Sequence, residues 1–322
     1  MRIGILAYEG CFASEVFAVS DFLRIADHVA RDNGAADPFR TSVIAATPEP
    51  VTAAGGFTIG ARRWHHRFDL IVVPGFELTP ATDLDARLGE RSREIAFLRT
   101  AGRRGTRIAS VCVGAFLLGE AGLLNGRRCT TSWLFASRLA RRYPQSTVCA
   151  ESLIVTAEQI VTTAAFTASL DLATSIVRDH LGAGVARAAA RITLVSENRT
   201  SQAPYVVESM VERTVGPFAI RVQHWLVDHL GEPYSLARLA DAFHLSTRTV
   251  LRRYADEAGG SPLNFLHEAR IGTAKRLLTD TDVPIGEIPR RVGYQDPSAL
   301  RRLFQDRVGM GLGDYRRQFR TR

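Results

Sequence analysis

Cysteine is scarce in this 322-residue chain, and the spacing of the few cysteines excludes two kinds of site. The four cysteines, Cys11, Cys112, Cys129 and Cys149, form no C-x-x-C pair. This spacing argues against a structural zinc site and against a disulfide framework. We therefore predict neither a metal site nor a bound cofactor.

Long apolar runs are also missing. No run approaches the roughly 20 apolar residues that a membrane-spanning helix needs, so the sequence predicts no membrane partner. Residues 1–8 begin directly with a strand-like pattern and lack the layout of a signal peptide. The expected location is therefore the cytoplasm.

Lysine is nearly absent, yet the chain is basic. Lys275 is the only lysine, so arginine carries almost all of the net charge of +8. Residues 217–322 hold 17 basic and 12 acidic residues, a net charge of +5. A basic excess that is denser at one end favours a phosphate-binding surface there, although charge alone is also compatible with simple solubility.

Residues 1–195 alternate strand and helix signals, which is typical of a parallel sheet with crossover helices. The predicted strands cover residues 3–7, 41–46, 70–73 and 107–111, with two more inside 148–163. The predicted helices cover residues 14–30, 87–103, 114–124, 133–142, 167–181 and 185–195. We therefore predict a doubly wound, flavodoxin-like α/β domain over residues 1–195. Residues 196–217 lose this periodicity and are rich in polar residues and proline, which predicts a linker.

Residues 218–322 are expected to be all-α and to contain two helix-turn-helix units. The units cover residues 235–254 and 284–304 and repeat one pattern. Leu236, Leu239 and Phe243 of the first unit match Ile285, Ile288 and Val292 of the second. Two copies of one such unit suggest two helices that enter successive stretches of the DNA major groove, so double-stranded DNA is the predicted partner.

The second helix of each unit offers side chains for contact with DNA. Ser246 and Asp296 are expected to cap these helices. Val250 and Tyr254 of the first helix, and Leu300 and Phe304 of the second, are expected to face the core. The exposed candidates are Thr247, Arg248, Thr249, Arg252, Ser298, Ala299, Arg301 and Arg302. Arginine suits this role because its fork can bind O6 and N7 of guanine together.

The C-terminal stretch resembles the AraC/XylS family of transcription regulators. The resemblance rests on L-A-R-L-A-D-A-F-H-L-S-T-R-T-V-L-R-R-Y, G-G-S-P-L-N-F-L-H-E-A-R-I-G-T-A-K-R-L-L, V-G-Y-Q-D-P-S-A-L-R-R-L-F-Q-D-R-V-G and D-Y-R-R, which occur in this order. The likeness implies that Arg248 and Arg252 read bases in the first unit, and Ser298 and Arg302 in the second.

Two features depart from that family. Its members usually carry Ser-Pro in the closing motif, where this chain reads G-M-G-L-G-D-Y over residues 309–315. Pro289 falls inside the predicted helix 285–292, where proline removes a hydrogen bond and kinks the backbone. These departures predict a second unit that is looser or that contacts mainly phosphates.

Three residues at predicted strand ends indicate a ligand site in the N-terminal half. Glu15 begins the helix after the first strand, Gly75 follows the third, and Cys112 lies at a strand-to-helix turn. In an open parallel sheet, ligands bind at the carboxyl ends of the strands. Such a turn is expected to expose the thiol of Cys112, and the helix N-terminus is expected to lower its pKa.

Residues 1–195 resemble the ThiJ/PfpI branch of the class I glutamine amidotransferase-like superfamily. The resemblance rests on I-G-I-L-A-Y-E-G, S-E-V-F-A-V-S-D-F-L, I-V-V-P-G and S-V-C-V-G-A-F-L-L-G-E-A-G-L-L-N-G-R-R-C-T-T-S-W. It implies that Cys112 stands at the nucleophile position with Glu15 beside it. The family commonly has histidine where this chain has Ser132, and serine cannot shuttle protons near neutral pH. His65 and His66 are alternative proton carriers in a loop-like stretch.

We therefore predict that the N-terminal half is not an enzyme and that Glu15, Gly75, Cys112 and Ser132 line a ligand pocket. Three alternatives stay open: a ThiJ/PfpI-type cysteine enzyme, a thiol redox sensor with a Cys11–Cys112 disulfide, and a Cys112 that is simply a small buried residue.

The order of the two halves is similar to that in the GlxA-type group of regulators. This resemblance implies that the first domain serves as a sensor and dimerisation module. The sequence thus predicts a sequence-specific transcription regulator controlled by an unknown small-molecule effector. A homodimer is expected, with residues 167–195 as the candidate interface, and RNA polymerase is a further candidate partner.

Overall fold

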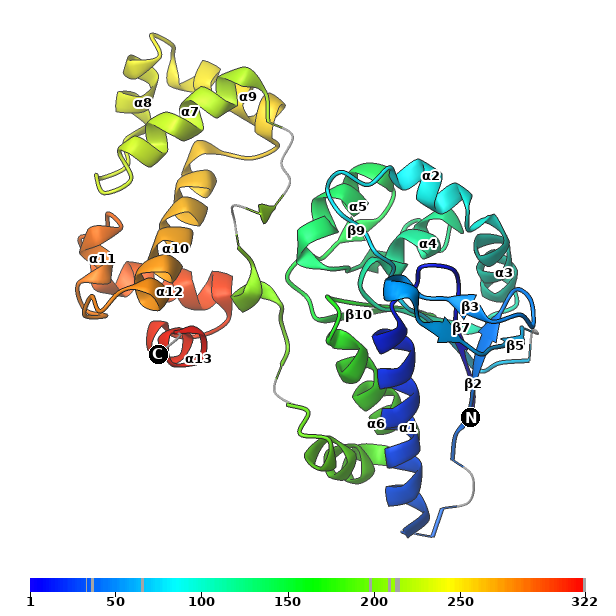
Figure 1. Cartoon of the computed structure of the whole chain (residues 1–322). Coiled ribbons are helices and arrows are strands. Elements are labelled where there is room, and N and C mark those ends of the chain that lie inside the picture. The colour runs from blue at the N-terminus through cyan, green and yellow to red at the C-terminus, as the bar shows by residue number, and fades with distance from the viewer. Residues whose placement is uncertain are drawn as a thin grey trace. The chain divides into compact units, whose positions relative to one another are not determined.

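The chain folds into two compact units, Met1–Gln202 and Ala203–Arg322 (Figure 1). The structure is a computed structural model that describes residues 1–320 except 33, 36–37, 65–66, 197–198, 208–209 and 212–214. Within these residues, no helix combines the length and the apolar character needed to cross a bilayer.

The N-terminal unit is built on a seven-stranded sheet with the order β10-β11-β7-β6-β1-β2-β5. Its strands are β1 (Arg2–Leu6), β2 (Arg40–Ala45), β5 (Arg62–Arg63), β6 (Leu70–Val73), β7 (Arg107–Ser110), β10 (Ile154–Ala157) and β11 (Ile160–Thr163). All neighbouring pairs are parallel except β10 and β11. All four side chains of β6 are buried, as expected for a strand covered on both faces. The predicted α/β fold with a parallel sheet is confirmed.

Two small sheets went unpredicted because their strands have only two residues each and carry no periodicity. They pair β3 (Val51–Thr52) with β4 (Thr58–Ile59), and β8 (Arg128–Cys129) with β9 (Thr147–Val148).

Helices lie on both sides of the large sheet, and α1 and α6 pack side by side (Figure 1). The helices are α1 (Ala13–Asp32), α2 (Leu84–Gly89), α3 (Ser92–Arg103), α4 (Ala115–Glu120), α5 (Ala136–Arg142) and α6 (Ala168–Ile192). Short 3-10 turns are η1 (Ala54–Gly56), η2 (Cys112–Gly114) and η3 (Trp133–Phe135). The predicted helix 87–103 is two helices, because Arg91 leaves the helical region between α2 and α3. The predicted break in α6 occurs at Gly182, which has a φ of 86°.

The boundary between the units falls inside the segment that was predicted as a linker. The backbone N–H of Gln202 donates to the Glu151 carbonyl at 2.9 Å, within the first unit. The carbonyl of Val206 accepts from Nζ of Lys275 at 2.9 Å, within the second. Gln202 is therefore hydrogen-bonded within the first unit and Val206 within the second.

The C-terminal unit is all helical, as predicted. Its helices are α7 (Pro217–Asp228), α8 (Leu236–Ala242), α9 (Thr247–Ala258), α10 (Pro262–Asp280), α11 (Ile288–Arg291), α12 (Pro297–Val308) and α13 (Leu312–Phe319), preceded by the 3-10 turn η4 (Ala203–Tyr205). One apolar core joins α7, α8, α9 and the start of α10, and a second joins the rest of α10 to α11, α12 and α13. Each core contains one helix-turn-helix unit, and Leu230 packs against both.

The kink expected from Pro289 inside a helix was wrong. Helix α11 begins at Ile288 rather than at Ile285, so Pro289 occupies the first turn. Backbone N–H groups there have no partner within the helix, so proline costs nothing and no kink arises. Both Ile288 and Pro289 are buried. The missing Ser-Pro also leaves α13 intact, although Gly311 offers no side-chain cap of the kind that Ser261 gives α10.

Gly293 follows α11 at a position that only glycine suits. Its φ is 86°, and a Cβ there would overlap the Leu230 carbonyl and lie 2.6 Å from Nη2 of Arg270. We expect Gly293→Ala to lower the free energy of unfolding by about 2–4 kcal/mol, from backbone strain and overpacking together. Denaturant unfolding followed by circular dichroism measures this change. Gly286→Ala is the control, because open space surrounds that position, and equal losses in both variants would contradict the argument.

Candidate DNA interface and ligand site

Helix α9 is held at both ends and along one face. The Ser246 hydroxyl accepts from the backbone N–H of Thr249 at 3.2 Å, and Gly259 closes the other end with a φ of 70°. Val250 and Tyr254 are buried in the core. The orientation of the opposite face is therefore fixed by capping and packing.

Three of the four candidates on α9 lie on the exposed part of the helix. Thr247, Arg248 and Arg252 are exposed. Thr249 is half-buried, and its hydroxyl lies 2.8 Å from that of Ser246. The geometry thus assigns Thr249 to the cap and leaves the other three available for contact.

Helix α12 repeats this arrangement. The Asp296 carboxylate accepts from the backbone N–H of Ser298 at 2.8 Å, which together with nearby Arg302 lowers the pKa of Asp296. Gly309 ends the helix with a φ of 79°. Leu300 and Phe304 are buried in the same spacing as Val250 and Tyr254 of α9. Of the predicted contact residues, Ser298, Arg301 and Arg302 are exposed and Ala299 is half-buried.

The arginines of the C-terminal unit divide into bound and unbound groups. Arg253 pairs with Glu257 at 3.1 Å and lies over the Phe218 ring. Arg238, Arg291, Arg317 and Arg320 pair with carboxylates, and Arg270 and Arg316 donate to backbone carbonyls. Arg248, Arg252 and Arg301 have no hydrogen-bond or ion-pair partner among the described residues.

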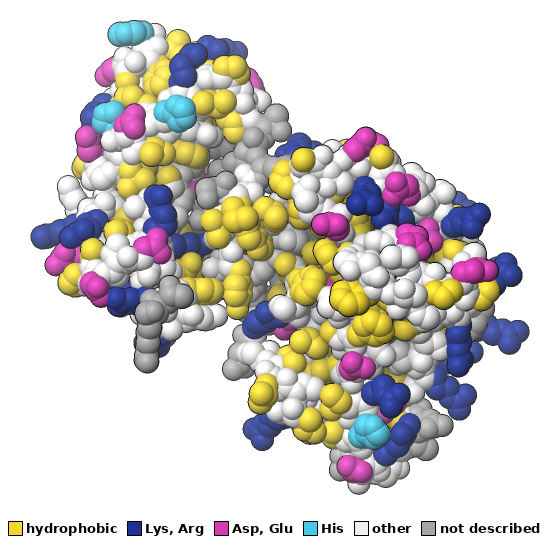
Figure 2. Space-filling view, in the orientation of Figure 1, with side chains coloured by type: hydrophobic (Ala, Val, Ile, Leu, Met, Phe, Trp, Pro, Cys, Tyr) yellow, Lys and Arg dark blue, Asp and Glu magenta, His cyan; other side chains and the backbone are white. Residues whose placement is uncertain are grey.

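The partners of the arginines are more informative about the contact surface than the distribution of charge over the surface. On the face shown in Figure 2, basic and acidic side chains of the C-terminal unit alternate rather than gather into one patch. The candidate contact surface is therefore best identified by Arg248, Arg252 and Arg301, which have no hydrogen-bond or ion-pair partner among the described residues.

In the N-terminal unit, Glu15, Gly75 and Cys112 come together at the carboxyl ends of the strands. The backbone N–H of Gly75 donates to Oε2 of Glu15 at 2.6 Å. A Cβ on Gly75 would lie 3.2 Å from Cβ of Cys112 and 3.3 Å from Oε2 of Glu15. Gly75 is thus the close approach that lets the carboxyl and the thiol share one site.

Cys112 occupies the predicted strand-to-helix turn. Its φ is 52°, in the left-handed region, and it is the first residue of the η2 turn. Its backbone N–H donates to the Ala164 carbonyl at 3.0 Å, and its carbonyl accepts from the Thr131 hydroxyl at 2.8 Å. Ser132, next to Thr131, is buried at the start of η3.

The expected exposure and lowered pKa of Cys112 were wrong. The residue is only 7% exposed. Burial raises its thiol pKa to about 12, with a smaller contribution from Glu15. The helix that follows has only a 3-10 turn and six α-helical residues, so loss of solvation outweighs its dipole. At neutral pH the thiol is protonated, and the thiolate is the form that attacks electrophiles.

Glu15 is also protonated at neutral pH. Burial raises its pKa to about 8, against the opposing hydrogen bond from Gly75. The carboxyl is 1% exposed, and its Oε1 is buried without a partner among the residues that the structure describes. A protonated carboxyl with one free oxygen can donate a hydrogen bond to a small bound molecule.

Residues around the site were missed by sequence reasoning. Phe12 and Phe166 form an edge-to-face pair with centroids 5.4 Å apart, and the Phe12 N–H donates to the Gly75 carbonyl. Gln202 bonds to the loop that carries Ser132 through Thr131 and Trp133. Gln202 went unnoticed because it lies in a polar stretch without periodicity.

The structure bears on the predicted alternative of a Cys11–Cys112 disulfide. All four cysteines carry free thiols, so this disulfide is not formed, and burial raises the pKa of the Cys11 thiol to about 11. His65 and His66 lie outside the described residues. Across the described ranges, no group of three or more His, Cys, Asp or Glu residues could hold a metal ion.

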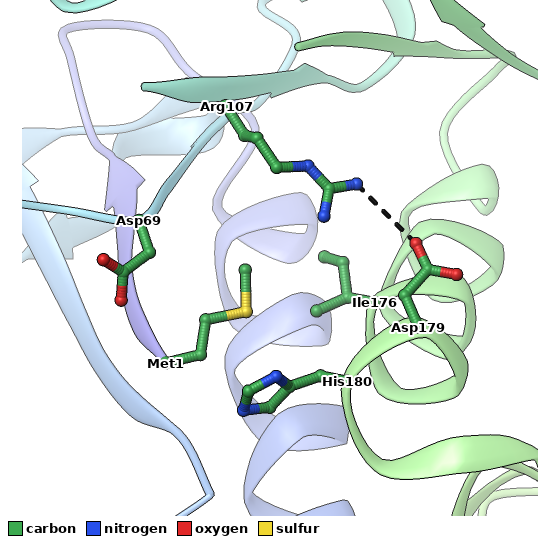
Figure 3. A pocket seen from close by; sticks show the side chains of 6 residues that line it. All are labelled: Met1, Asp69, Arg107, Ile176, Asp179 and His180. Carbon is green, nitrogen blue, oxygen red and sulfur yellow. Dashed lines mark ion pairs between the residues drawn. The ribbon is translucent and has the colours of Figure 1, made fainter. Parts of the chain in front are cut away.

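A separate cavity of about 410 Å³ lies at the amino ends of the strands (Figure 3). Its lining residues are Met1, Asp69, Arg107, Ile176, Asp179 and His180. The polar groups of this lining already have partners. Arg107 pairs with Asp179 at 3.6 Å, and the Asp69 carboxylate accepts from the Arg2 N–H. Nε2 of His180 lies 3.1 Å from the Pro38 carbonyl. This cavity therefore lacks the unpartnered group found at Glu15.

Comparison with known proteins reveals two matched families. Residues 1–179 match the DJ-1/PfpI family, and residues 239–318 match a helix-turn-helix domain. The HTH-type transcriptional regulator CdhR of Pseudomonas aeruginosa is 27% identical over 281 residues, covering 84% of this chain and 80% of that protein.

Two further relatives agree with these matches. The HTH-type transcriptional regulator GlxA of Rhizobium meliloti is 28% identical over 66% of this chain and 67% of its own. The crystal structure of a ThiJ/PfpI family protein from Pseudomonas syringae superposes with a TM-score of 0.50 at 23% identity, covering 62% of this chain and 76% of that one. The last comparison shows a shared fold.

Proposed function

The chain belongs to the DJ-1/PfpI family and ends in an AraC-type helix-turn-helix domain, and we propose that this DNA-binding transcription regulator reads DNA with α9 and α12. The observation that carries the proposal is the repeated geometry of these two helices. Each has 12 residues, a capped start, a glycine end and a buried apolar face. Each presents exposed arginines on its other side.

The predicted contact residues divide into three proposed roles. Arg248 and Arg252 of α9 and Ser298 and Arg302 of α12 read base edges. The remaining exposed candidates, Thr247 and Arg301, contact the phosphate backbone, which positions the helices without reading sequence. Thr249 and Ala299 support the helix starts.

The N-terminal unit acts in this proposal as a ligand-responsive module rather than as an enzyme. A protonated Cys112 and a serine at position 132 supply neither a nucleophile nor a proton shuttle at neutral pH. The free oxygen of Glu15 supports recognition of a small effector at Glu15, Gly75 and Cys112. The effector regulates DNA binding only if its affinity differs between the two states of the protein.

A homodimer is part of the proposal. Two protomers would double the DNA site and make its symmetry and spacing part of the specificity. RNA polymerase is the proposed further partner when the site lies near a promoter.

Selection of duplexes from a random pool, followed by footprinting, tests the DNA-binding proposal. We expect one conserved sequence with two contact segments about one helical turn, or about 10 base pairs, apart for each protomer. Affinity should fall steeply with salt as phosphate contacts release counterions. A protein that enriches no sequence would overturn the proposal.

Cys112→Ala tests the non-enzymatic role of the N-terminal unit. We expect the affinity for the selected duplex to stay within about twofold of wild type, because distant sites act almost independently when no effector is present. Fluorescence polarisation measures this affinity. Turnover of any small molecule that disappears in Cys112→Ala would contradict this expectation and favour a cysteine enzyme.

A further inference from the structure

Arg91 is a buried arginine at the break between α2 and α3 of the N-terminal unit. Its backbone leaves the helical region, with a φ of −107° and a ψ of 24°, and its side chain is only 4% exposed. Its ion-pair partner Glu90, at 3.2 Å, is 62% exposed, and Nε is buried without a hydrogen-bond partner among the described residues. Burying a cation with so little compensation costs stability. Arg91 therefore contributes through its other contacts rather than through this ion pair.

One set of these contacts is with the loop that follows β1. Nη2 of Arg91 donates to the Glu9 carbonyl at 2.8 Å, and the guanidinium lies 5.6 Å from the centroid of the Tyr8 ring. A Cβ on Gly10, whose φ is 73°, would lie 3.4 Å from Nη2. Residues 8–10 therefore pack directly on the guanidinium, and cation–π attraction adds to the hydrogen bond.

The second set of contacts is with the loop that carries Gly75. The guanidinium of Arg91 lies 5.0 Å from the centroid of the Phe76 ring. On the other side of Gly75, the Pro74 carbonyl accepts from the hydroxyl of Tyr8, the same residue whose ring lies against Arg91. Both chain neighbours of Gly75 are therefore held, one by Arg91 itself and the other through Tyr8.

The position of Gly75 decides how Glu15 presents its carboxyl group. The Gly75 N–H donates to Oε2 of Glu15 at 2.6 Å, and the Gly75 carbonyl accepts from the Phe12 N–H at 2.9 Å. While Oε2 is engaged in this way, Oε1 stays without a partner among the residues that the structure describes. A shift of Gly75 would release Oε2, and the carboxyl group could then rotate.

We infer that Arg91 is a positioning residue of the candidate ligand site, which holds the Gly75 N–H on Oε2 of Glu15 and so keeps Oε1 available to a bound molecule. Arginine suits this role because its planar fork donates to the carbonyls of Arg87 and Glu9 while its faces cover aromatic rings. The use of Oε1 by an effector rests on the proposed function, whereas the effect of Arg91 on the Gly75 hydrogen bond does not.

Hydrogen exchange of the Gly75 amide tests this inference in the full-length protein. The Val72 amide is the internal reference, because β6 pairs with both β1 and β7 at this residue. A purely stabilising role of Arg91 would change both amides together. We expect Arg91→Met to raise the ratio of the Gly75 rate to the Val72 rate at least about fivefold, the effect of losing one hydrogen bond. An unchanged ratio would overturn the inference.

Arg93→Met is the matched control. Arg93 lies two residues further along α3 and is exposed, so its replacement removes the same charge from the surface. The Gly75 rate of this variant should stay within about twofold of wild type, as for most surface substitutions. An acceleration as large as that of Arg91→Met would assign the effect to net charge and would also overturn the inference.

Arg91→Lys guards against a variant that fails to fold. Lysine keeps the charge, but one ammonium cannot donate to both carbonyls and cover both rings at once. This variant should therefore also raise the ratio of the two rates, and circular dichroism checks its folding. An unchanged ratio in folded Arg91→Lys would overturn the inference. Loss of folding in both variants would overturn it as well, because Arg91 would then serve stability alone.

The proposed function and this inference can fail separately. The exchange rates of Gly75 and Val72 are measured without effector or DNA, so they decide the role of Arg91 on their own. If the ratio rises as expected and no small molecule alters DNA binding, the ligand-responsive role fails while the positioning role of Arg91 stands.

Discussion

Replacing Arg248 and Arg252 together with alanine is expected to weaken binding to the selected duplex by about a hundredfold or more. Each arginine that reads a guanine contributes about 1–3 kcal/mol of discrimination. Both side chains are exposed on α9 and have no partner among the described residues. Their removal therefore takes nothing from the fold, and the loss should appear in binding alone.

Arg253→Ala is the matched control for this experiment. Arg253 lies on the same helix but pairs with Glu257 and covers the Phe218 ring. Its loss should lower the stability of the C-terminal unit and leave the ratio of specific to non-specific affinity nearly unchanged. Polarisation measurements with selected and scrambled duplexes at two salt concentrations separate these effects. Equal loss of discrimination in Arg253→Ala would show that α9 presents a different face to DNA.

Local sequence signals were sufficient for the helices of the candidate DNA interface. Ser246 and Asp296 cap α9 and α12, as predicted, and glycines 259 and 309 end these helices. Helix caps and apolar spacing act within a few residues of one another, which is why they can be read from the sequence. The effect of Pro289 was predicted wrongly because α11 begins three residues later than predicted. The exact first residue of a helix decides whether a proline falls in its first turn or in its interior, and helix ends are hard to locate to within one or two residues.

The sequence was sufficient to predict that Glu15, Gly75 and Cys112 lie together, but not to predict the protonation of this candidate ligand site. Strand ends identified Glu15, Gly75 and Cys112, since parallel strands bring their carboxyl ends to one edge. Cys112 is protonated because segments that are distant in the sequence bury it. Ala164 and Thr131, which hydrogen-bond to the backbone of Cys112, belong to these segments. Gln202 was missed for the same reason, because its three partners lie 52 to 71 residues away.

Glu15 should make the stability of the N-terminal unit depend on pH. Burial raises its pKa from 4.5 to about 8 in the folded protein. Between these values the folded state holds a proton that the unfolded state has released. The stabilising contribution is thus fully present below the unfolded pKa and is lost as pH rises through the folded pKa. At about 1.4 kcal/mol for each pKa unit, the loss is on the order of 4–5 kcal/mol.

Glu15→Gln is expected to remove this dependence. The amide oxygen can accept from the Gly75 N–H as Oε2 does, and the NH₂ group takes the place of the protonated Oε1. The variant should match the wild type near pH 5 and exceed its free energy of unfolding near pH 9 by several kcal/mol. Denaturant unfolding of both proteins across this range isolates the residue, because every other titrating group is shared. Parallel curves would mean that folded Glu15 is ionised, and the site would then favour a hydrogen-bond donor or a cation over an acceptor oxygen.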